Sequence, residues 1–332
     1  MVPLELELWG DGARAGQGAE LPVAISPRHG RLDLVEWARE NRDEIESLTA
    51  SAGAVLLRGF EPLSLSRLGD LVEVFSSRPL DYRYGHGPRG RIHRYIYNSS
   101  DIAPEIVIPL HNELAYARRW PLRLWFMCID APRSGGQTPI VDSRRVLAAI
   151  TPAVVEAFEA NGVMYLRNFG ETHGEDVSWQ QAFETESRSD VEDYCRRFDI
   201  GFEWLENDRL RTRTVCPATA LHTVTGERVW FNQAHLFHPT AIERPQRLAL
   251  LARFGSEGLA RNAFFGDGSP IPASMLTEIR DAYRRAEVRF SWVPKDVLMV
   301  DNMLVAHGRA AFSGSRRVVV AMADPVEQPA LR

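Results

Sequence analysis

The histidine and glutamate of His111-Asn112-Glu113 are residue types that bind transition metals, and they follow the apolar stretch 106–110. Residues i and i+2 of an extended strand point to the same side of the backbone, so this spacing directs one imidazole and one carboxylate toward a common point. His307, at the edge of another strand-like segment, is the candidate third ligand. Two histidines and one carboxylate on one face of a metal leave the opposite face open, which is the arrangement of non-heme Fe(II) oxygenases.

The composition is that of a globular protein and excludes several classes of partner. The chain has 332 residues, of which 45% are hydrophobic and 25% charged, and its net charge is -5. A mildly acidic chain offers no electrostatic footprint for nucleic acid, and no apolar run reaches the roughly 18 residues that a membrane helix needs. The three cysteines are too few and too widely spaced for a disulfide framework or a zinc ribbon. We therefore expect a cytoplasmic protein with no nucleic-acid or membrane partner.

The hydrophobic pattern predicts a β-rich α+β protein whose residues 1–332 form a single catalytic domain. Apolar spacing predicts helices at residues 33–51, 65–75, 143–158, 245–254 and 275–286. Strands are predicted at residues 54–58, 119–129, 138–141, 212–216, 228–232, 288–292, 297–301 and 317–322. Because strands and helices do not alternate regularly, two facing sheets of a jelly roll with helices packed outside suit the pattern better than a doubly wound sheet. Residues 170–210 interrupt the strands and are interpreted as a lid-like insertion, and residues 240–286 as a helical segment.

Two further motifs give the sequence a family resemblance. Gly135-Gly136-Gln137-Thr138 follows the His-x-Glu motif, and His307 is followed at short distance by Arg316-Arg317 and an apolar strand. With these motifs in this order, residues 54–324 resemble the TauD/TfdA family of Fe(II)/2-oxoglutarate dioxygenases, in the clavaminate-synthase-like branch that has Glu in its iron motif. Within that branch the chain looks most like the syringomycin-pathway hydroxylase group. The resemblance implies a double-stranded β-helix, where the sequence pattern alone indicates a mixed, β-rich core.

The resemblance also implies the cofactors and the reaction. Fe(II), 2-oxoglutarate and O2 would convert an unactivated C–H bond to an alcohol, with succinate and CO2 as coproducts. Thr138 falls where the family has a threonine that helps to bind 2-oxoglutarate, and Arg317 best fits the arginine that holds the far carboxylate of this cosubstrate. Since Arg316 and Arg317 are neighbours on a strand, they point to opposite faces and only one can reach the site.

The expected substrate is a small molecule, an amino acid or amino-acid derivative, free or tethered to a carrier protein, in natural-product biosynthesis. The taurine enzyme has a second arginine four residues after its cosubstrate arginine, and Ala321 stands there in this chain, which argues against a sulfonate. Asn232 and Arg309 are candidate substrate contacts. The arginine-rich loop at residues 79–94 and the insertion at 170–210 are expected to form the entrance.

Other functions use the same residue types. Desaturation or epoxidation would share the iron and 2-oxoglutarate site with hydroxylation. A zinc hydrolase could use two histidines and a glutamate around an activated water, and a jelly-roll binding protein could have the same fold with an inert metal site. A second group of histidines, His222, His235 and His238, offers a rival metal site, but it lacks a carboxylate at suggestive spacing, so core positions are the preferred interpretation.

Overall fold

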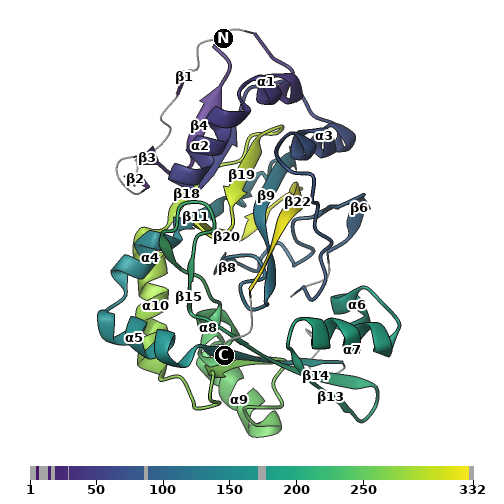
Figure 1. Ribbon diagram of the computed structural model, residues 1–332, viewed down its shortest axis with the longest axis vertical. Coiled ribbons are helices and arrows are strands. Elements are labelled where there is room, and N and C mark those ends of the chain that lie inside the picture. The colour runs from purple at the N-terminus through teal and green to yellow at the C-terminus, as the bar shows by residue number, and fades with distance from the viewer. Residues whose placement is uncertain are drawn as a thin grey trace.

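The centre of the molecule is a pair of β-sheets surrounded by helices (Figure 1). A computed structural model describes residues 5–6, 14–15, 19–28, 30–85, 89–170 and 177–328. The large sheet has eight strands in the spatial order β1 (Glu5–Leu6), β4 (Val23–Ser26), β5 (Ala54–Leu57), β19 (Val297–Asp301), β9 (Arg119–Asp130), β22 (Arg317–Glu327), β7 (Ile96–Asn98) and β6 (Arg91–His93). The small sheet has four, in the order β18 (Val288–Phe290), β11 (Thr138–Asp142), β20 (Val305–Arg309) and β8 (Ile108–His111).

The two sheets face each other across a shared hydrophobic cluster. Phe126 of the large sheet contacts His307 of the small sheet, with ring centroids 5.0 Å apart. Along β22, Val318 and Val320 belong to the cluster between the sheets. Val319 and Ala321 belong to a second cluster, on the other face of the large sheet, together with buried residues of the first three helices. The large sheet is therefore apolar on both faces, as expected for a sheet covered on both sides.

A third sheet lies beside this pair. It has four strands in the order β13 (Gly201–Leu205), β14 (Arg209–Cys216), β12 (Val163–Phe169) and β17 (Arg261–Phe265). Three two-stranded ribbons complete the strands, formed by β2 (Arg14–Ala15) with β3 (Ala19–Glu20), β10 (Ser134–Gly135) with β21 (Phe312–Ser313), and β15 (Thr219–Leu221) with β16 (Arg228–Trp230).

The helices occupy the outside of the sheets (Figure 1). They are α1 (Leu34–Glu40), α2 (Arg42–Ala52), α3 (Leu65–Phe75), α4 (Ser143–Ala149), α5 (Pro152–Asn161), α6 (Trp179–Phe183), α7 (Arg188–Arg197), α8 (Ala234–Phe237), α9 (Arg244–Phe254), α10 (Ala273–Ala286) and the short 3-10 helix η2 (Pro239–Ala241). None of the helices in the described part of the chain is long and apolar enough to span a bilayer.

The predicted helix at 65–75 is confirmed, whereas two other predicted helices are each interrupted. The helix predicted at 33–51 breaks at Asn41, whose side-chain amide donates to the carbonyl of Trp37 (2.8 Å) and so competes with the helical pattern. The helix predicted at 143–158 breaks before Pro152, because the residue preceding a proline is disfavoured in helical conformation. Thr151 is the N-cap residue of α5, and Pro152 is its first helical residue.

The insertion predicted at 170–210 is an ordered part of the third sheet over its described residues 177–210. It forms α6, α7, β13 and the start of β14, while residues 171–176 lie outside the described residues. It packs against the arginine-rich loop, since Tyr84 N donates to the carbonyl of Ala182 (2.5 Å) and Arg91 pairs with Glu184 (3.1 Å). The segment therefore supports the loop at 79–85.

Candidate metal centre

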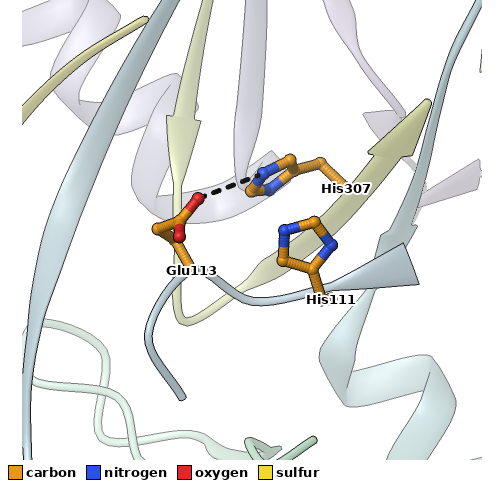
Figure 2. A group of neighbouring side chains, drawn as sticks. All are labelled: His111, Glu113 and His307. Atoms are coloured by element: carbon orange, nitrogen blue, oxygen red, sulfur yellow. Dashed lines mark ion pairs between the residues drawn. The ribbon is translucent and has the colours of Figure 1, made fainter. Parts of the chain in front are cut away.

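The side chains of His111, Glu113 and His307 converge on one point between the sheets (Figure 2). His111 ends β8 and is paired in register with His307 of β20, and their ring centroids lie 4.6 Å apart. The Nε2 atom of His307 is 3.9 Å from Oε2 of Glu113. One ligand atom from each residue lies within 4.8 Å of the other two, and no other such cluster occurs in the described part of the chain.

The position of Glu113 depends on a clamp that the sequence reasoning missed. Strand β8 ends at His111, so Glu113 stands in the turn beyond it and not in the strand, as the i, i+2 argument assumed. Asn302 accepts a hydrogen bond from Glu113 N (2.6 Å), and its amide nitrogen donates to the carbonyls of Glu113 and Pro121 (both 2.9 Å). All the polar groups of this buried amide are therefore used, and two of its three hydrogen bonds fix the backbone of Glu113.

The surroundings of the two histidines favour neutral imidazoles. Burial is the main cause that lowers the pKa of His111, and it lowers the pKa of His307 well below the usual value. His111 Nδ1 lies 2.9 Å from the carbonyl of Pro109, which can only accept, so Nδ1 carries the proton and Nε2 is left as a lone-pair donor. Neutral imidazoles with a fixed tautomer are what metal coordination requires.

Glu113 also forms a buried ion pair with Arg89. The Nη2 atom of Arg89 is 2.6 Å from Oε2 of Glu113, and the two side chains are 11% and 3% exposed. Burial acts to lower the pKa of Arg89, but the nearby carboxylate outweighs burial and the pKa is raised. The guanidinium also lies over the ring of Tyr82, 4.4 Å from its centroid. Glu113 is thus shared between a permanent cation and the point where the histidines converge.

These residues lie in a cavity with a volume of about 310 Å³, at the small end of the roughly 300–1,000 Å³ typical of small-molecule sites. Its wall next to β8 is the segment from Ser99 to Pro109, and another wall comes from α8 and the residues just after it. Outside the segment 99–109, the lining residues are Tyr82, Arg89, His111, Glu113, Tyr116, Phe126, Thr138, Gln233, Leu236, Ala241, Ile242, Arg261, His307, Gly308, Arg309 and Arg316. No described residue of 177–210 lines the cavity, which corrects the prediction that this segment forms part of its entrance.

Thr138 lies in the cavity, as the sequence predicted. Of the two neighbouring arginines, Arg316 lines the cavity and Arg317 does not, which is opposite to the prediction. Thr138 is 3% exposed and lines the cavity, and its hydroxyl accepts a hydrogen bond from Trp292 Nε1 (2.8 Å). Arg317 is exposed and lies outside the cavity, whereas Arg316 lines it. Arg316 immediately precedes β22, which begins at Arg317, and the pairing of β22 with β9 is irregular between Arg317 and Val318, so simple alternation along the strand does not assign the two side chains to their faces. Because β22 is apolar on both faces, its sequence could not indicate which face was inner.

The two candidate substrate residues are both engaged in holding the backbone. Asn232 is fully buried outside the cavity lining, donates to the carbonyl of Ala218 (2.8 Å) and accepts from Ala234 N (3.1 Å). This removes the basis for the predicted contact of Asn232 with substrate.

Arg309 does line the cavity, but its terminal nitrogens donate to the carbonyls of Ile102, Ala103 and Ile106 at 2.6–2.8 Å. These hydrogen bonds occupy both terminal nitrogens of Arg309, which therefore fixes the wall at residues 99–109. The carbonyls that it binds lie far from it in the sequence, so no local pattern could reveal this role.

The second histidine group does not converge on one point. His222 Nε2 bonds Asp301 (2.9 Å), His235 stacks on Tyr283 with ring centroids 4.4 Å apart, and His238 accepts from Thr240 N (3.1 Å). Each of the three therefore has its own structural partner, in agreement with the preferred interpretation.

Comparison with known proteins identifies a family over nearly the whole chain. Residues 17–322 match the family described as Taurine catabolism dioxygenase TauD, TfdA family. The Dapdiamide synthesis protein DdaC of Enterobacter agglomerans is 40% identical over 282 residues, which are 85% of this chain and 85% of that protein. A clavaminate synthase-like protein of Arabidopsis thaliana is 29% identical over 324 residues, 91% of this chain and 93% of the relative.

Solved structures with low sequence identity share the fold. PvcB, described as an Fe, alpha-ketoglutarate dependent oxygenase from an isonitrile synthetic pathway, superposes with a TM-score of 0.54 at 16% identity, over 98% of this chain and 94% of that chain. AAD-2, solved in complex with Mn(II) and N-oxalylglycine, gives a TM-score of 0.55 at 11% identity, over 99% and 100% of the two chains. The arrangement of mixed sheets and outer helices is therefore shared by these solved structures.

Proposed function

Because this chain belongs to the TauD/TfdA family and is a 2-oxoglutarate-dependent non-heme iron dioxygenase, we propose that it hydroxylates a C–H bond of an amino acid or amino-acid derivative. The observation that carries this proposal is the convergence of two neutral imidazoles and one carboxylate at the wall of a small cavity. The similarity to a dapdiamide synthesis protein supports a place in natural-product biosynthesis.

His111, Glu113 and His307 are proposed as the iron ligands. Their donor set, two nitrogens and one oxygen with an open side toward the cavity, is the one that suits Fe(II) in this class of oxygenase. When bound, Fe(II) with 2-oxoglutarate and O2 supplies the oxidising equivalents for the C–H bond, and succinate and CO2 leave as coproducts. The residues themselves hold the ligand atoms: Asn302 fixes the backbone of Glu113, and the Pro109 carbonyl fixes the ring of His111.

Arg316 and Thr138 are proposed to bind 2-oxoglutarate. Arg316 uses Nε to donate to the carbonyl of Gly136 (3.1 Å), and its two terminal nitrogens donate to no described residue. A planar guanidinium anchored in this way can give two parallel hydrogen bonds to a carboxylate. The Thr138 hydroxyl already accepts from Trp292, so its proton is directed to an outside acceptor. Arg316 thus takes the role that the sequence assigned to Arg317.

The cavity walls are proposed to orient the substrate and exclude water. Phe126, Tyr116 and Leu236 present aromatic and aliphatic surface near the histidines, while Ile106 and Val107 form an exposed apolar lip. An apolar enclosure keeps water away from the reacting carbon. Hydroxylation, desaturation and epoxidation share the same ligands, and hydroxylation is the outcome that we propose.

The proposal includes the context of the enzyme. We take residues 1–332 as one catalytic domain, the two facing sheets as the double-stranded β-helix of the family, and the syringomycin-pathway hydroxylases as a related group. The three cysteines are buried and free, and unpaired thiols suit a reducing compartment such as the cytoplasm.

A screen of oxygen consumption and succinate release tests the proposed function. The protein is supplied with Fe(II), 2-oxoglutarate and a panel of amino acids and their derivatives. We expect substrate-stimulated succinate release in the wild type and none in His307→Ala. Stimulation by taurine alone, or equal stimulation in the variant, would refute the proposal.

A further inference from the structure

The cavity is strongly cationic for its size. Four arginines line it, Arg89, Arg261, Arg309 and Arg316, and Glu113 is the one carboxylate among its described lining residues. Divalent iron would add to the positive charge, and 2-oxoglutarate would offset two charges. An excess of positive charge therefore remains, so an anionic substrate is favoured over a cationic one.

The terminal nitrogens of two of these arginines already have a role. Arg309 donates to three carbonyls of the cavity wall, and Arg316 is the residue proposed to hold 2-oxoglutarate. Arg261 packs over the ring of Phe237, 5.8 Å from its centroid. Arg89 remains as the arginine beside the metal ligands.

One terminal nitrogen of Arg89 lacks a hydrogen-bond acceptor among the described residues. Nη2 bonds Glu113, whereas Nη1 is buried and has no hydrogen-bond partner in the described part of the chain. A buried charged donor without a partner is unfavourable, and Nη1 belongs to a residue of the cavity wall. An acceptor on a ligand would satisfy it. Since Arg89 and His307 both approach Oε2 of Glu113, that acceptor would lie beside the proposed iron.

The same lining lacks a partner for an ammonium group. Glu113, its sole described carboxylate, is bonded to Arg89 and is a proposed metal ligand, so it is not available to a substrate cation. A neutral acceptor is present: Gln233 uses its amide nitrogen on the carbonyl of Asn112 (2.6 Å), and its Oε1 accepts no hydrogen bond from any described residue. An amide N–H could donate to Gln233 Oε1 without the cost of burying an unpaired charge.

We propose that Arg89 binds the carboxylate of the substrate and that the nitrogen of that substrate is uncharged, as in an N-acylated amino acid. This inference rests on the proposed function and narrows its substrate class. A free amino acid would bring an unpaired ammonium into a cationic cavity. An aminoacyl thioester on a carrier protein would bring the ammonium and lack the carboxylate, so it fits the cavity least well.

Matched ligands test the two parts of the inference. Each of the common L-amino acids is supplied free, as its Nα-acetyl derivative and as its N-acetylcysteamine thioester. The readouts are the change that each ligand causes in the anaerobic visible absorption of the protein with Fe(II) and 2-oxoglutarate, and succinate release in air. We expect a response from one or more acetylated acids at concentrations at least about 100-fold below those at which the free or thioester form acts.

Arg89→Gln tests the assignment of the carboxylate, with Arg91→Gln as the matched control. Arg91 is half exposed and pairs with Asp81 and Glu184 outside the cavity. Arg89→Gln should raise the Kd of the acetylated ligand by about 100-fold and retain the Fe(II)/2-oxoglutarate absorption, which shows that the variant folds and binds metal. Arg91→Gln should leave the Kd unchanged. Arg89→Lys should fall between, because it keeps the charge and loses the planar fork.

The outcomes separate this inference from the proposed function. If the wild type gives no Fe(II)/2-oxoglutarate absorption, the proposed function fails. If the absorption forms but free amino acids or thioesters act as well as acetylated acids, or no acetylated acid acts, the inference fails while the iron chemistry stands. Equal ligand affinity in the wild type and in Arg89→Gln would also overturn it.

Discussion

Replacement of Arg316, and not of its neighbour Arg317, should abolish tight binding of 2-oxoglutarate. Arg316 lies just before β22 and lines the cavity, is tied to the carbonyl of Gly136 through Nε, and directs its terminal nitrogens to no described protein group. Arg317 is exposed and lies outside the cavity lining. The two arginines have the same charge and are adjacent in the chain, so they form a matched pair for mutation.

The expected magnitude follows from the contacts that Arg316 can make. Two hydrogen bonds between a guanidinium and a carboxylate contribute about 1.5–3 kcal/mol each. Loss of both should therefore cost about 3–4 kcal/mol after allowance for residual binding by Thr138 and the metal, since such contributions are not additive. At about 1.4 kcal/mol per tenfold change, the Kd of 2-oxoglutarate should rise by about 100- to 1,000-fold in Arg316→Ala.

Calorimetric titration of 2-oxoglutarate into the Mn(II)-loaded protein measures this difference. Arg317→Ala should change the Kd less than about threefold. Burial, reinforced by Arg309, lowers the pKa of Arg316 to about 10, and the guanidinium is charged below that pH. The guanidinium is therefore charged at pH 8, where the titration is carried out. A larger effect of Arg317→Ala than of Arg316→Ala would refute the assignment.

Three further predictions concern the parts that support the site. Asn302→Ala should lower the free energy of unfolding by about 3 kcal/mol in urea denaturation and weaken Mn(II) binding, because three buried backbone groups lose their partner; unchanged Mn(II) affinity would contradict the clamp. Burial lowers the pKa of His235 to about 3, so the unfolded chain takes up a proton below about pH 6.5 that the folded chain does not. Stability should then fall by about 2 kcal/mol between pH 6.5 and 5, and less in His235→Phe, which can still stack on Tyr283; an equal loss in both proteins would count against this. Arg309→Lys should speed proteolysis within residues 102–106, since an ammonium cannot reproduce the planar fork that holds three carbonyls, and an unchanged cleavage rate would show that the wall is held by other contacts.

The sequence predicts the metal centre well, because two of its three ligands are only two residues apart and the third lies beside a strand-like segment. The pair His111 and Glu113 is visible in three residues, and His307 stands at the edge of an apolar strand. The imidazole of His111 and the carboxylate of Glu113 converge as their spacing predicts, but Glu113 lies in a turn fixed by Asn302 and not in the strand. Such a clamp joins positions 189 residues apart, so no local pattern can reveal it.

The errors at Arg317, Asn232 and the insertion have a common physical origin. In each case the residue type was informative, but the face or neighbour that it meets is set by tertiary packing. β22 is apolar on both sides, so alternation could not indicate the inner face. Asn232 spends its amide on the backbone. The insertion joins a third sheet through β14 and β12, a pairing between distant segments that composition does not encode.

The most direct test of the account is the anaerobic visible absorption of the protein mixed with Fe(II) and 2-oxoglutarate. The wild type should develop a charge-transfer band, because His111, Glu113 and His307 are the proposed ligands of the iron to which 2-oxoglutarate would bind. His111→Ala and His307→Ala should each abolish the band, while Arg317→Ala should retain it. Persistence of the full band in either histidine variant would contradict the assignment of this metal centre.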